Sequence, residues 1–537
     1  MDPERLLARL SDPTFYPEPT SRVEVLQTHI SWLFLTDSYV YKVKKPVNFG
    51  FLDYTTLERR REMCDREVTL NKRLCPDIYL GVAEFRDDRG TLSIDGPGET
   101  IEVAVKMVRL PKDRMLRKVL SRGEGELGIF ERMAAILVDF HAHAETSPEI
   151  QQLKRVEGVK FNCDENFAQT EKYVGTLVPW RTFEVIRNST NLFLRRRAAL
   201  FNRRAAEGRV RDGHGDLHLD SICVTDPIRI FDCIEFNERF RYADVAEEVA
   251  FLAMDLEFHG YPYFARRFVD AYHAASEDDE LLELLDFYKC YRAFVRAKIN
   301  SFQVDDTQIP AKRRTKLSAI ATKYYELAAH YADEFNPRRL FVTCGLTGSG
   351  KSTLARKLGE RYALQVVRSD GVRKQLLGIQ ANERRWVPFN TGEYAPSITE
   401  RTYASMVQRA EELLALGHSV VLDGCFTKGA QRLPVLELAR RAGVPLLLIE
   451  CRTPERVIRE RLERRAAKNG SLSDGRLEIY QQQVLEWEPP YEIPPDERLV
   501  VDRSKPVEEL MDELTDVAPP QWADRDDEDP QPPAREG

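Results

Sequence analysis

The first 335 residues show two different periodic patterns of apolar and polar positions. Within residues 20–120, ISWLFLTDSYVYKVKK and TIEVAVKMVRL alternate as strands do, and TTLERRREMCDREVTLNKRL between them has the spacing of one helix. Residues 121–335 place apolar residues mostly at helical intervals, with a short β-like stretch at about 214–236. The pattern predicts a sheet-rich segment followed by a helical one.

A third pattern begins after EFNPRR, where the helical spacing of apolar residues ends. Strand-like runs LFVTCG, LQVVRSD, SVVLDG and PLLLIEC then alternate with helical segments, which is typical of a parallel sheet. The final stretch is acidic and Pro-rich, and we expect it to be disordered. The predicted domains are therefore 1–120, 121–335, 336–512 and a 513–537 tail.

Composition narrows the class of protein only slightly. The 537 residues have a net charge of -8, which gives no general attraction to nucleic acid or anionic membranes. No run approaches the roughly 20 apolar residues of a membrane span, and charges interrupt the apolar start MDPERLLARL, unlike a signal peptide. The nine cysteines form no C-x-x-C pair, so we expect a cytoplasmic protein with neither a disulfide framework nor a zinc site.

The segment GLTGSGKST at 345–353 fits the phosphate-binding pattern G-x-x-x-x-G-K-[ST] between a strand and a helix. Glycines let backbone N–H groups converge on phosphate oxygens, and the helix adds its positive N-terminal end. Lys351 is expected to reach the β- and γ-phosphates of ATP, and Ser352 to bind Mg²⁺. The residues predicted to form this cradle are Gly345, Thr347, Gly348, Ser349, Gly350, Lys351, Ser352 and Thr353.

Charged residues after the following strands are candidates for the chemistry. Asp370, after LQVVRS, is a candidate to accept a hydroxyl proton or steer magnesium, with a plain helix cap as the alternative. Asp423, at the end of VVLD, is a candidate metal ligand. Arg461 and Arg465, in ERVIRERLERRAAK with Arg459 and Arg464, are candidates to offset phosphate charge, against the alternative of a solvated helix face.

The order of GLTGSGKST, RSDGVRKQL, TGEYAPSITERTY, VVLDGCF and the arginine-rich helix resembles the small P-loop kinases grouped with gluconate kinase, zeta toxins and polynucleotide 5′-kinases. The resemblance covers about residues 338–510. It implies an α/β P-loop NTPase domain with a parallel sheet that transfers a phosphoryl group from ATP. The acceptor differs widely within that group, so the resemblance does not specify it.

The stretch HGDLHLDSI at 214–222 has three interpretations. His214, Asp216 and His218 could bind a metal, although no second cluster accompanies them, or they could be structural residues of a buried turn. In the third interpretation Asp216 is the base of a kinase catalytic loop, which receives a proton from the acceptor hydroxyl.

The kinase interpretation requires other residues in a fixed order. Asp232, in the strand-like run RIFDCIEFN that follows shortly after Asp216, supplies a second carboxylate for Mg²⁺. Lys106 in VAVK is one candidate for the phosphate-binding lysine. In the expected order this lysine precedes the helix that carries its partner Glu67, but Lys106 follows that helix. Lys42 and Lys44 lie before that helix and share a strand face, and Lys42 is favoured.

These parts resemble the aminoglycoside phosphotransferase family, whose fold is that of two-lobed protein kinases. KVKKPVNFGFLDYTTLERR, REVTLNKRLCPDIYLGV and HGDLHLDSI more closely resemble a bacterial group that fuses such a domain to a P-loop kinase domain, over residues 20–510. The resemblance implies an α+β two-lobed kinase-like domain at 1–335. Ser221 departs from the pattern, which has a metal-binding Asn there; Asp220 is a candidate substitute, and Glu235 a candidate helper at the metal.

The combined prediction is an ATP- and Mg²⁺-dependent phosphotransferase with two nucleotide-binding modules, which acts on a hydroxyl of a sugar, polyol or aminoglycoside. One alternative is a kinase of nucleic-acid 5′-hydroxyls; another is an ATP-gated regulatory protein with a degenerate first module, which Ser221 favours. The basic run at 195–211 could meet phosphates or RNA, but we expect a solvated helix face. The sequence specifies neither the oligomeric state nor which molecule of this class is the acceptor.

Overall fold

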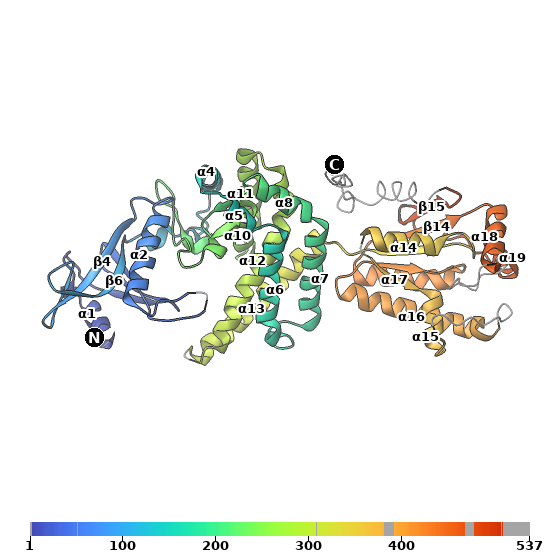
Figure 1. The fold of residues 1–537 in the computed structure, drawn as a ribbon, viewed down its shortest axis with the longest axis horizontal. Helices are drawn as coiled ribbons and strands as arrows, with labels where there is room; N and C mark the ends of the chain where they lie inside the picture. Colours follow the sequence, from blue (N-terminus) through green and yellow to red (C-terminus); the bar gives the residue numbers. More distant parts are fainter. Residues whose placement is uncertain are drawn as a thin grey trace, which may run out of the picture. The chain divides into compact units, whose positions relative to one another are not determined.

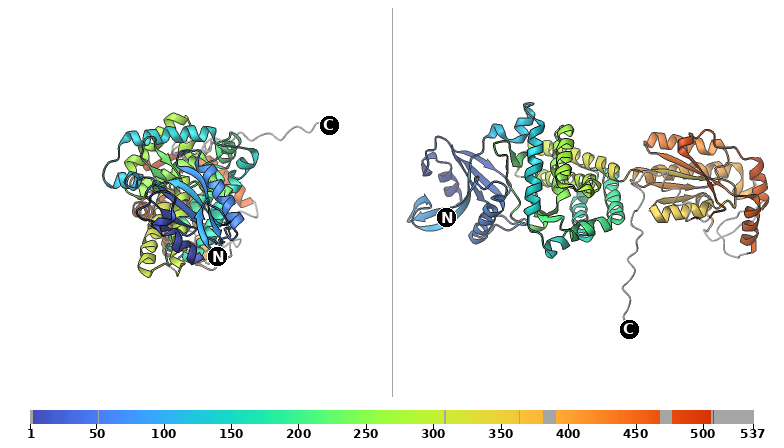
Figure 2. Two further views of the ribbon diagram at one scale, coloured as in Figure 1. Left: turned by 90° about the vertical axis from the view of Figure 1, so that its left-hand side faces the viewer. Right: turned by 90° about the horizontal axis from the view of Figure 1, so that it is seen from above.

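The computed structural model describes residues 3–50, 52–307, 309–362, 364–380, 391–467, 477–505 and 507 (Figures 1 and 2). It contains two compact units that interleave along the chain. The first comprises Met1–Gln169 and Ala198–Ala328, and the second Thr170–Arg197 and Ala329–Gly537. The predicted tail at 513–537 lies outside the described residues.

The first unit begins with a six-stranded sheet in the order β1-β2-β3-β6-β4-β5, in which all neighbours are antiparallel. The predicted strands and the helix between them are confirmed. The elements are α1 (Pro3–Leu10), η1 (Pro13–Phe15), β1 (Glu24–Gln27), β2 (Ser31–Leu35), β3 (Tyr39–Lys44), α2 (Leu57–Asn71), β4 (Tyr79–Asp88), β5 (Thr91–Ile94) and β6 (Glu99–Val108).

Strand alternation gives this sheet two different faces. Tyr41 and Val43 of β3 pack with the N-terminal segment α1–η1, whereas Val103 and Val105 of β6 pack with α2. Figure 1 shows α2 lying along the strands β4 and β6. The even-numbered side chains of β3 therefore point toward α2.

The rest of the first unit is mostly helical, as predicted. Helix α10 is buried almost all round, as a central core helix is, and packs against α11 and α12. The elements are η2 (Lys112–Arg114), α3 (Leu116–Ser121), α4 (Leu127–His143), α5 (Pro148–Gln152), α6 (Val156–Thr170), α8 (Ala198–Ala206), β7 (Val210–Asp212), η4 (Leu219–Ser221), β8 (Ile222–Cys223), β9 (Arg229–Ile230), α9 (Glu238–Arg241), β10 (Tyr242–Asp244), α10 (Val245–Phe258), α11 (Pro262–Ser276), α12 (Asp279–Asp305) and α13 (Ala311–Phe335), whose end lies in the second unit.

The second unit contains the predicted parallel sheet, with five strands in the order β12-β13-β11-β14-β15. Strand β15 was not among the predicted strands. The elements are η3 (Glu171–Tyr173), α7 (Trp180–Arg196), β11 (Leu340–Cys344), α14 (Lys351–Tyr362), β12 (Gln365–Arg368), α15 (Ser369–Leu376), η5 (Gly392–Tyr394), α16 (Pro396–Ala415), β13 (Val420–Asp423), α17 (Gly429–Ala442), β14 (Leu446–Arg452), α18 (Glu455–Ala467), α19 (Leu477–Leu485), η6 (Pro495–Glu497) and β15 (Arg498–Asp502).

Helices cover both faces of this sheet (Figures 1 and 2). Phe341 of β11 packs with α14, whereas its neighbours Leu340 and Val342 pack with α16 and α17. Because β11 is central, its C-terminal end is surrounded by the ends of other strands, where ligands bind in open α/β sheets.

Helix α7 belongs to the second unit although the helices α8 to α12 of the first unit lie between it and the sheet in sequence. Its Asn188 side chain donates to the carbonyl of Leu416 at 2.9 Å. A Cβ at Gly417 would lie 3.2 Å from the Cα of Val185, so the helix approaches this turn closely. The predicted boundaries at 120, 335 and 512 stay predictions, and the P-loop unit includes a segment from before residue 335.

Two expectations about the chain's chemistry can be compared with the described residues. All nine cysteines are free, and eight of them are buried. Within the described ranges, every helix is too short or too polar to cross a membrane.

Candidate functional sites

The phosphate-binding motif forms a tight loop between β11 and α14. Gly345 has φ +134° and Gly350 has φ +93°, a region that side chains disfavour. A Cβ at Gly345 would lie 2.6 Å from the carbonyl oxygen of Cys451 on β14. The sequence pattern therefore folds as the loop that it predicts, with Lys351 at the first position of α14.

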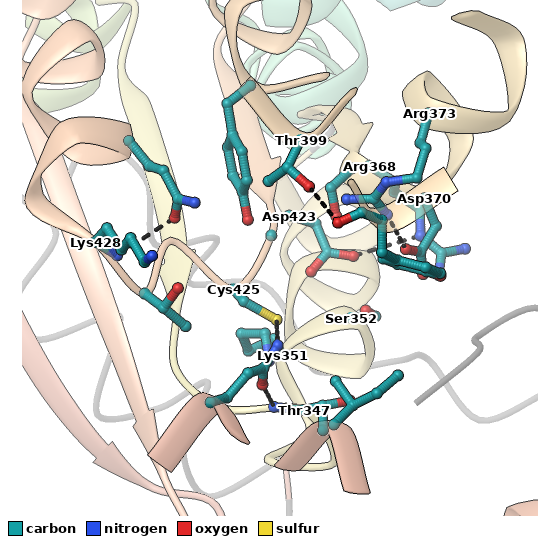
Figure 3. Close-up of a pocket in the computed structure, with 18 of the residues that line it drawn as sticks. Thr347, Lys351, Ser352, Arg368, Asp370, Arg373, Thr399, Asp423, Cys425 and Lys428 are labelled. Carbon is teal, nitrogen blue, oxygen red and sulfur yellow. Dashed lines mark hydrogen bonds and ion pairs between the residues drawn. The ribbon is translucent and has the colours of Figure 1, made fainter. Parts of the chain in front are cut away.

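This loop forms the floor of a cavity of about 250 Å³ (Figure 3). Its walls come from α15, α16, the loop after β13, and α19. The lining residues are Thr347, Gly348, Gly350, Lys351, Ser352, Arg368, Ser369, Asp370, Arg373, Tyr394, Pro396, Thr399, Glu400, Tyr403, Asp423, Gly424, Cys425, Thr427, Lys428, Gln431, Ile479, Gln483 and Glu486. Lys351, Ser352, Asp370 and Asp423, all predicted site residues, thus line one pocket.

Lys351 is largely buried and turns back on its own loop. Its Nζ donates to the carbonyl of Leu346 at 2.7 Å and lies 3.4 Å from Ser349 Oγ. A phosphate group would offer oxygens with a full negative charge in place of these neutral ones. The lysine is therefore positioned to exchange its present contacts for a phosphate.

Two of the acidic residues that line the cavity, Asp423 and Asp370, were predicted from the sequence. Asp423 is buried at the end of β13, where Thr343 donates to it at 3.2 Å and Arg368 Nε lies 3.4 Å away. Asp370 lies in the first turn of α15, and Arg373 Nη1 donates to it at 3.2 Å. In Figure 3 Asp370 and Arg373 lie on one side of the pocket, Lys428 on the other, and Asp423 between them.

Arginine approaches the loop from α18 and from a position that the sequence analysis missed. Arg461 Nη2 donates to the carbonyl of Arg503 at 2.7 Å. A Cβ at Gly350 would lie 3.2 Å from Arg503 Nε and 3.4 Å from Arg461 Nη1, so both guanidinium groups lie against the phosphate loop. Arg503 directly follows β15, a strand that the sequence pattern did not predict, so no sequence signal marked this residue.

The other arginines of α18 differ from Arg461. Arg459 pairs with Glu455 on the exposed side of the helix, which is the solvated arrangement that the sequence left open. Arg464 is exposed. The side chain of Arg465 lies outside the described residues, and its predicted role stays a prediction.

Gln483 of α19 is a second missed residue of this pocket. Its Oε1 accepts the Thr347 N–H at 2.8 Å, and its Nε2 lies 3.6 Å from Cys425 Sγ. An amide side chain thus connects the phosphate loop to the segment after β13. No motif marks a glutamine so distant from the loop in sequence, and only the fold shows it.

In the first unit, the structure brings together residues that lie far apart in the sequence. Lys42 Nζ lies 2.8 Å from Glu67 Oε1 and 2.7 Å from Asp232 Oδ1. Lys44 Nζ lies 2.7 Å from Glu67 Oε2. Lys106 instead lies over the rings of Tyr39 and Tyr41, away from Glu67. Both predicted lysines therefore contact the predicted glutamate.

Asp216 is held by a histidine of its own loop. His218 Nε2 lies 3.3 Å from Asp216 Oδ2, while His218 Nδ1 accepts the Asp220 N–H at 3.2 Å. Burial alone would raise the pKa of Asp216, but His218 and the nearby Arg296 outweigh it and lower that pKa well below its usual value. Asp216 is therefore ionised at neutral pH.

The metal interpretation of these histidines gains no support. His214 is buried, and its Nε2 contacts the carbonyl of Phe231 at 2.9 Å. Across the part of the chain that the structure describes, no group of three or more His, Cys, Asp or Glu side chains could hold a metal ion.

Ser221 and Asp220 have other partners. The Ser221 hydroxyl donates to the His218 carbonyl at 2.8 Å and accepts the His218 N–H at 3.1 Å. Asp220 forms two hydrogen bonds of 2.6 Å with Arg117. Either residue would have to give up these contacts to bind Mg²⁺, so their predicted metal roles stay predictions.

Glu248 of α10, which no sequence motif marked, accepts hydrogen bonds from the backbone of the HGD segment. One oxygen accepts the N–H groups of His214, at 2.6 Å, and Gly215, and the other contacts His141 Nε2 at 2.8 Å. A Cβ at Gly213 would lie 2.5 Å from this carboxylate, which explains the glycine. The carboxylate thus fixes the backbone just before Asp216.

This buried carboxylate makes the stability of the first unit sensitive to acid. Burial alone would raise the pKa of Glu248, but the hydrogen bond and charge of His141 outweigh it and lower that pKa to about 2. A carboxylate whose pKa is lower in the folded than in the unfolded protein stabilises the fold at any pH above its unfolded-state pKa. This stabilisation is lost as the pH falls to the folded-state pKa. We expect a loss of about 3 kcal/mol between pH 5 and pH 2.

Urea unfolding of wild type and Glu248→Gln at several pH values measures this effect. The variant should be less stable than wild type at pH 6, and its stability should fall less steeply between pH 5 and pH 2. Parallel pH curves for the two proteins would contradict the assignment to Glu248.

A protein-family model agrees with the architecture of the second unit. The model of the AAA domain matches residues 340–490, which contain the phosphate loop and strands β11–β14. Among solved structures, a sugar kinase from Janibacter sp. HTCC2649 is 22% identical over 35% of this chain and 99% of its own, with a TM-score of 0.27. The APS kinase CysC of Mycobacterium tuberculosis is 20% identical over 34% and 96%, with a TM-score of 0.24.

Relatives also match along most of the chain. Uncharacterized protein Rv2004c of Mycobacterium tuberculosis (strain ATCC 25618 / H37Rv) is 31% identical over 458 residues, which are 85% of this chain and 88% of that protein. Uncharacterized protein Mb2027c of Mycobacterium bovis matches with the same identity and coverage. The match therefore includes both units. At this identity and coverage, the chain belongs to the family of these mycobacterial proteins, with a P-loop domain of the AAA type in its second unit.

Proposed function

We propose that the chain is an ATP-dependent phosphotransferase whose second unit moves the γ-phosphoryl group of ATP to a hydroxyl group of a small molecule. The observation that carries the proposal is a single cavity lined by Lys351 and Ser352 of the phosphate loop and by Asp370 of α15. A site for simple nucleotide binding needs the loop alone. A carboxylate in the same cavity suits a base for an acceptor hydroxyl.

Each residue then has a role in positioning and charge stabilisation. The loop amides and Lys351 bind the phosphates, and Arg461 and Arg503 offset the charge that develops during transfer. Asp370 accepts the proton of the acceptor hydroxyl while the oxygen of that hydroxyl attacks the γ-phosphorus in line. The bond from this phosphorus to the β–γ bridging oxygen breaks, and ADP leaves. Ser352 and Asp423 are hard oxygen donors that suit Mg²⁺, which offsets the charge of the phosphate oxygens when bound.

Replacing Asp370 by asparagine tests this proposal. The variant should still bind ATP, but transfer should fall on the order of 10²–10⁴-fold because the base is lost. Labelled ATP with a panel of sugars, polyols, aminoglycosides and 5′-hydroxyl oligonucleotides measures transfer, in chains that also carry Asp216→Ala.

Glu411→Gln removes an exposed carboxylate of α16 that pairs with Arg441, and serves as the control. Unchanged transfer in Asp370→Asn would exclude Asp370 as the base. Transfer to oligonucleotides alone, with steep salt dependence, would favour the nucleic-acid kinase.

We also propose a second, kinase-like nucleotide site in the first unit. The contacts among Lys42, Glu67 and Asp232 support it, because a kinase site would need a lysine for phosphate, a glutamate to orient it and a carboxylate for Mg²⁺ close together. Asp216 would serve as its base. The resemblance to aminoglycoside phosphotransferases gives the fold of this proposal and not its acceptor.

One observation favours a regulatory role for this first site. Ser221 stands where the aminoglycoside phosphotransferase pattern has a metal-binding Asn. Its hydroxyl already makes two hydrogen bonds with His218. A site that lacks one metal ligand would bind ATP without transferring it. ATP binding that survives Lys351→Ala, without Asp216-dependent transfer to any acceptor, would identify an ATP-gated regulatory unit.

A further inference from the structure

Two lysines of β3 share one carboxylate but differ in exposure. Lys42 Nζ contacts one oxygen of Glu67 at 2.8 Å, and Lys44 Nζ contacts the other at 2.7 Å. The Lys42 side chain is 11% exposed, whereas Lys44 and Glu67 are fully buried. One carboxylate between two ammonium groups leaves a buried positive charge that needs another partner.

Glu235 supplies that partner. Its Oε1 forms an ion pair with Lys44 and accepts a hydrogen bond from the Tyr54 hydroxyl at 2.7 Å. Burial alone would lower the pKa of Lys44, but Glu235 and Glu67 outweigh it and raise that pKa well above its usual value. Lys44 and Glu235 therefore form an ion pair in the interior of the unit, with side chains 0% and 5% exposed.

The pair lies close in sequence to a strained position. Asp232 has φ +66°, a conformation that non-glycine residues rarely adopt and that surrounding contacts must maintain. Its N–H contacts the Tyr79 hydroxyl at 3.1 Å, and the next N–H, of Cys233, donates to the Asn71 side chain at 2.9 Å. The Glu235–Lys44 pair holds the same segment to β3 from the buried side, beside the contact between Lys42 and Asp232 itself.

The two lysines consequently face different surroundings. Lys42 reaches Asp232, whose side chain is 56% exposed and accessible to a ligand. Lys44 reaches Glu235, whose side chain is 5% exposed. A phosphate could approach Lys42 without breaking the interior pair, whereas reaching Lys44 would require opening it.

We propose that Lys44 and Glu235 form a fixed ion pair that positions the Asp232 segment, and that Lys42 alone is the ligand-facing lysine. The proposal deepens the nucleotide site proposed for the first unit and rests on it. Glu235 is then a positioning residue and not a ligand of Mg²⁺.

Three variants of the full chain test the pair: Lys44→Met, Glu235→Leu and the double variant, each with Lys351→Ala so that the second unit is silenced. Hydrogen exchange of residues 229–237 without nucleotide reports on the segment itself. The Mg²⁺ concentration needed for half-maximal ATP binding reports on the site. Tyr54→Phe, which removes one hydrogen bond but keeps the pair, is the matched control.

Each single variant should lose protection in residues 229–237 and need about 10-fold more Mg²⁺, as expected for an indirect support of a metal ligand. The double variant should recover most of both, because no unpaired charge remains buried. If a single variant fails to fold but the double variant folds, this outcome also supports the proposal.

Two outcomes would overturn the proposal. Unchanged exchange in both single variants would show that the pair does not hold the segment. A raised Mg²⁺ requirement in Glu235→Leu and in the double variant, but not in Lys44→Met, would make Glu235 a metal ligand. If the parent chain with Lys351→Ala binds no ATP, the proposed first site fails, while the exchange measurements still decide whether the pair holds Asp232.

Discussion

Replacing Lys351 by alanine should lower the ATP turnover of the second unit by about 100-fold or more, which is typical for the loss of one charge-stabilising group. The lysine is the cation of the phosphate loop, and its Nζ contacts oxygens of that loop. Its loss removes charge at the phosphates during transfer and opens the cavity floor. Turnover of labelled ATP measures the effect, in chains with Asp216→Ala so that the first unit does not contribute.

Lys357→Ala is the matched control, because Lys357 lies on the same helix, α14, but does not line the cavity. This variant should keep normal turnover. Equal turnover in the two lysine variants would mean that the phosphate loop is not the site of ATP consumption. Turnover that persists with both Lys351→Ala and Asp216→Ala would contradict both proposed sites.

Replacing Arg204 by alanine should destabilise the first unit by about 3–5 kcal/mol. Its guanidinium is fully buried between two carboxylates, with hydrogen bonds of 2.8 and 2.9 Å to Asp244 and of 2.7 and 3.0 Å to Asp278. Removing the cation leaves two buried acids without their shared partner. Urea unfolding followed by far-UV circular dichroism measures the loss.

The neighbouring arginine provides the control. Arg203 pairs with Glu280 at the surface, with side chains 43% and 30% exposed. Exposed pairs contribute little, so Arg203→Ala should change stability by less than about 1 kcal/mol. Similar losses in the two variants would show that burial of Arg204 does not have the stated effect.

Arg204 also shows that the exposure of a charged residue cannot be read from the composition of its segment. A run of arginines at 195–211 predicts a solvated basic face, because most arginines are exposed. For Arg204 that expectation is wrong, since its carboxylate partners are 40 and 74 residues away in sequence and only the fold brings them together. The same burial removes this arginine from any surface that could meet RNA.

Local patterns predicted the main strands and helices, with the exception of β15, and the residues with a fixed spacing. The glycines and Lys351 were predictable because their chemistry depends on one short loop, and Lys42 and Lys44 because strand side chains alternate. Gln483, Arg503 and Glu248 were not, because each reaches its site from an element that is distant in sequence. Their identification requires strand order and helix packing, which no spacing specifies.

Helix α7 has a consequence for how this protein can be divided. Its Asn188 holds the turn at Leu416, and its Arg196 contacts the carbonyl of Tyr362, yet helices α8 to α13 separate both residues from the phosphate loop in sequence. A gene fragment that begins after residue 335 encodes the whole parallel sheet but leaves one of its supporting helices behind. A P-loop unit that keeps all its own helices therefore consists of two separate stretches of sequence, one at 170–197 and one that starts at 329.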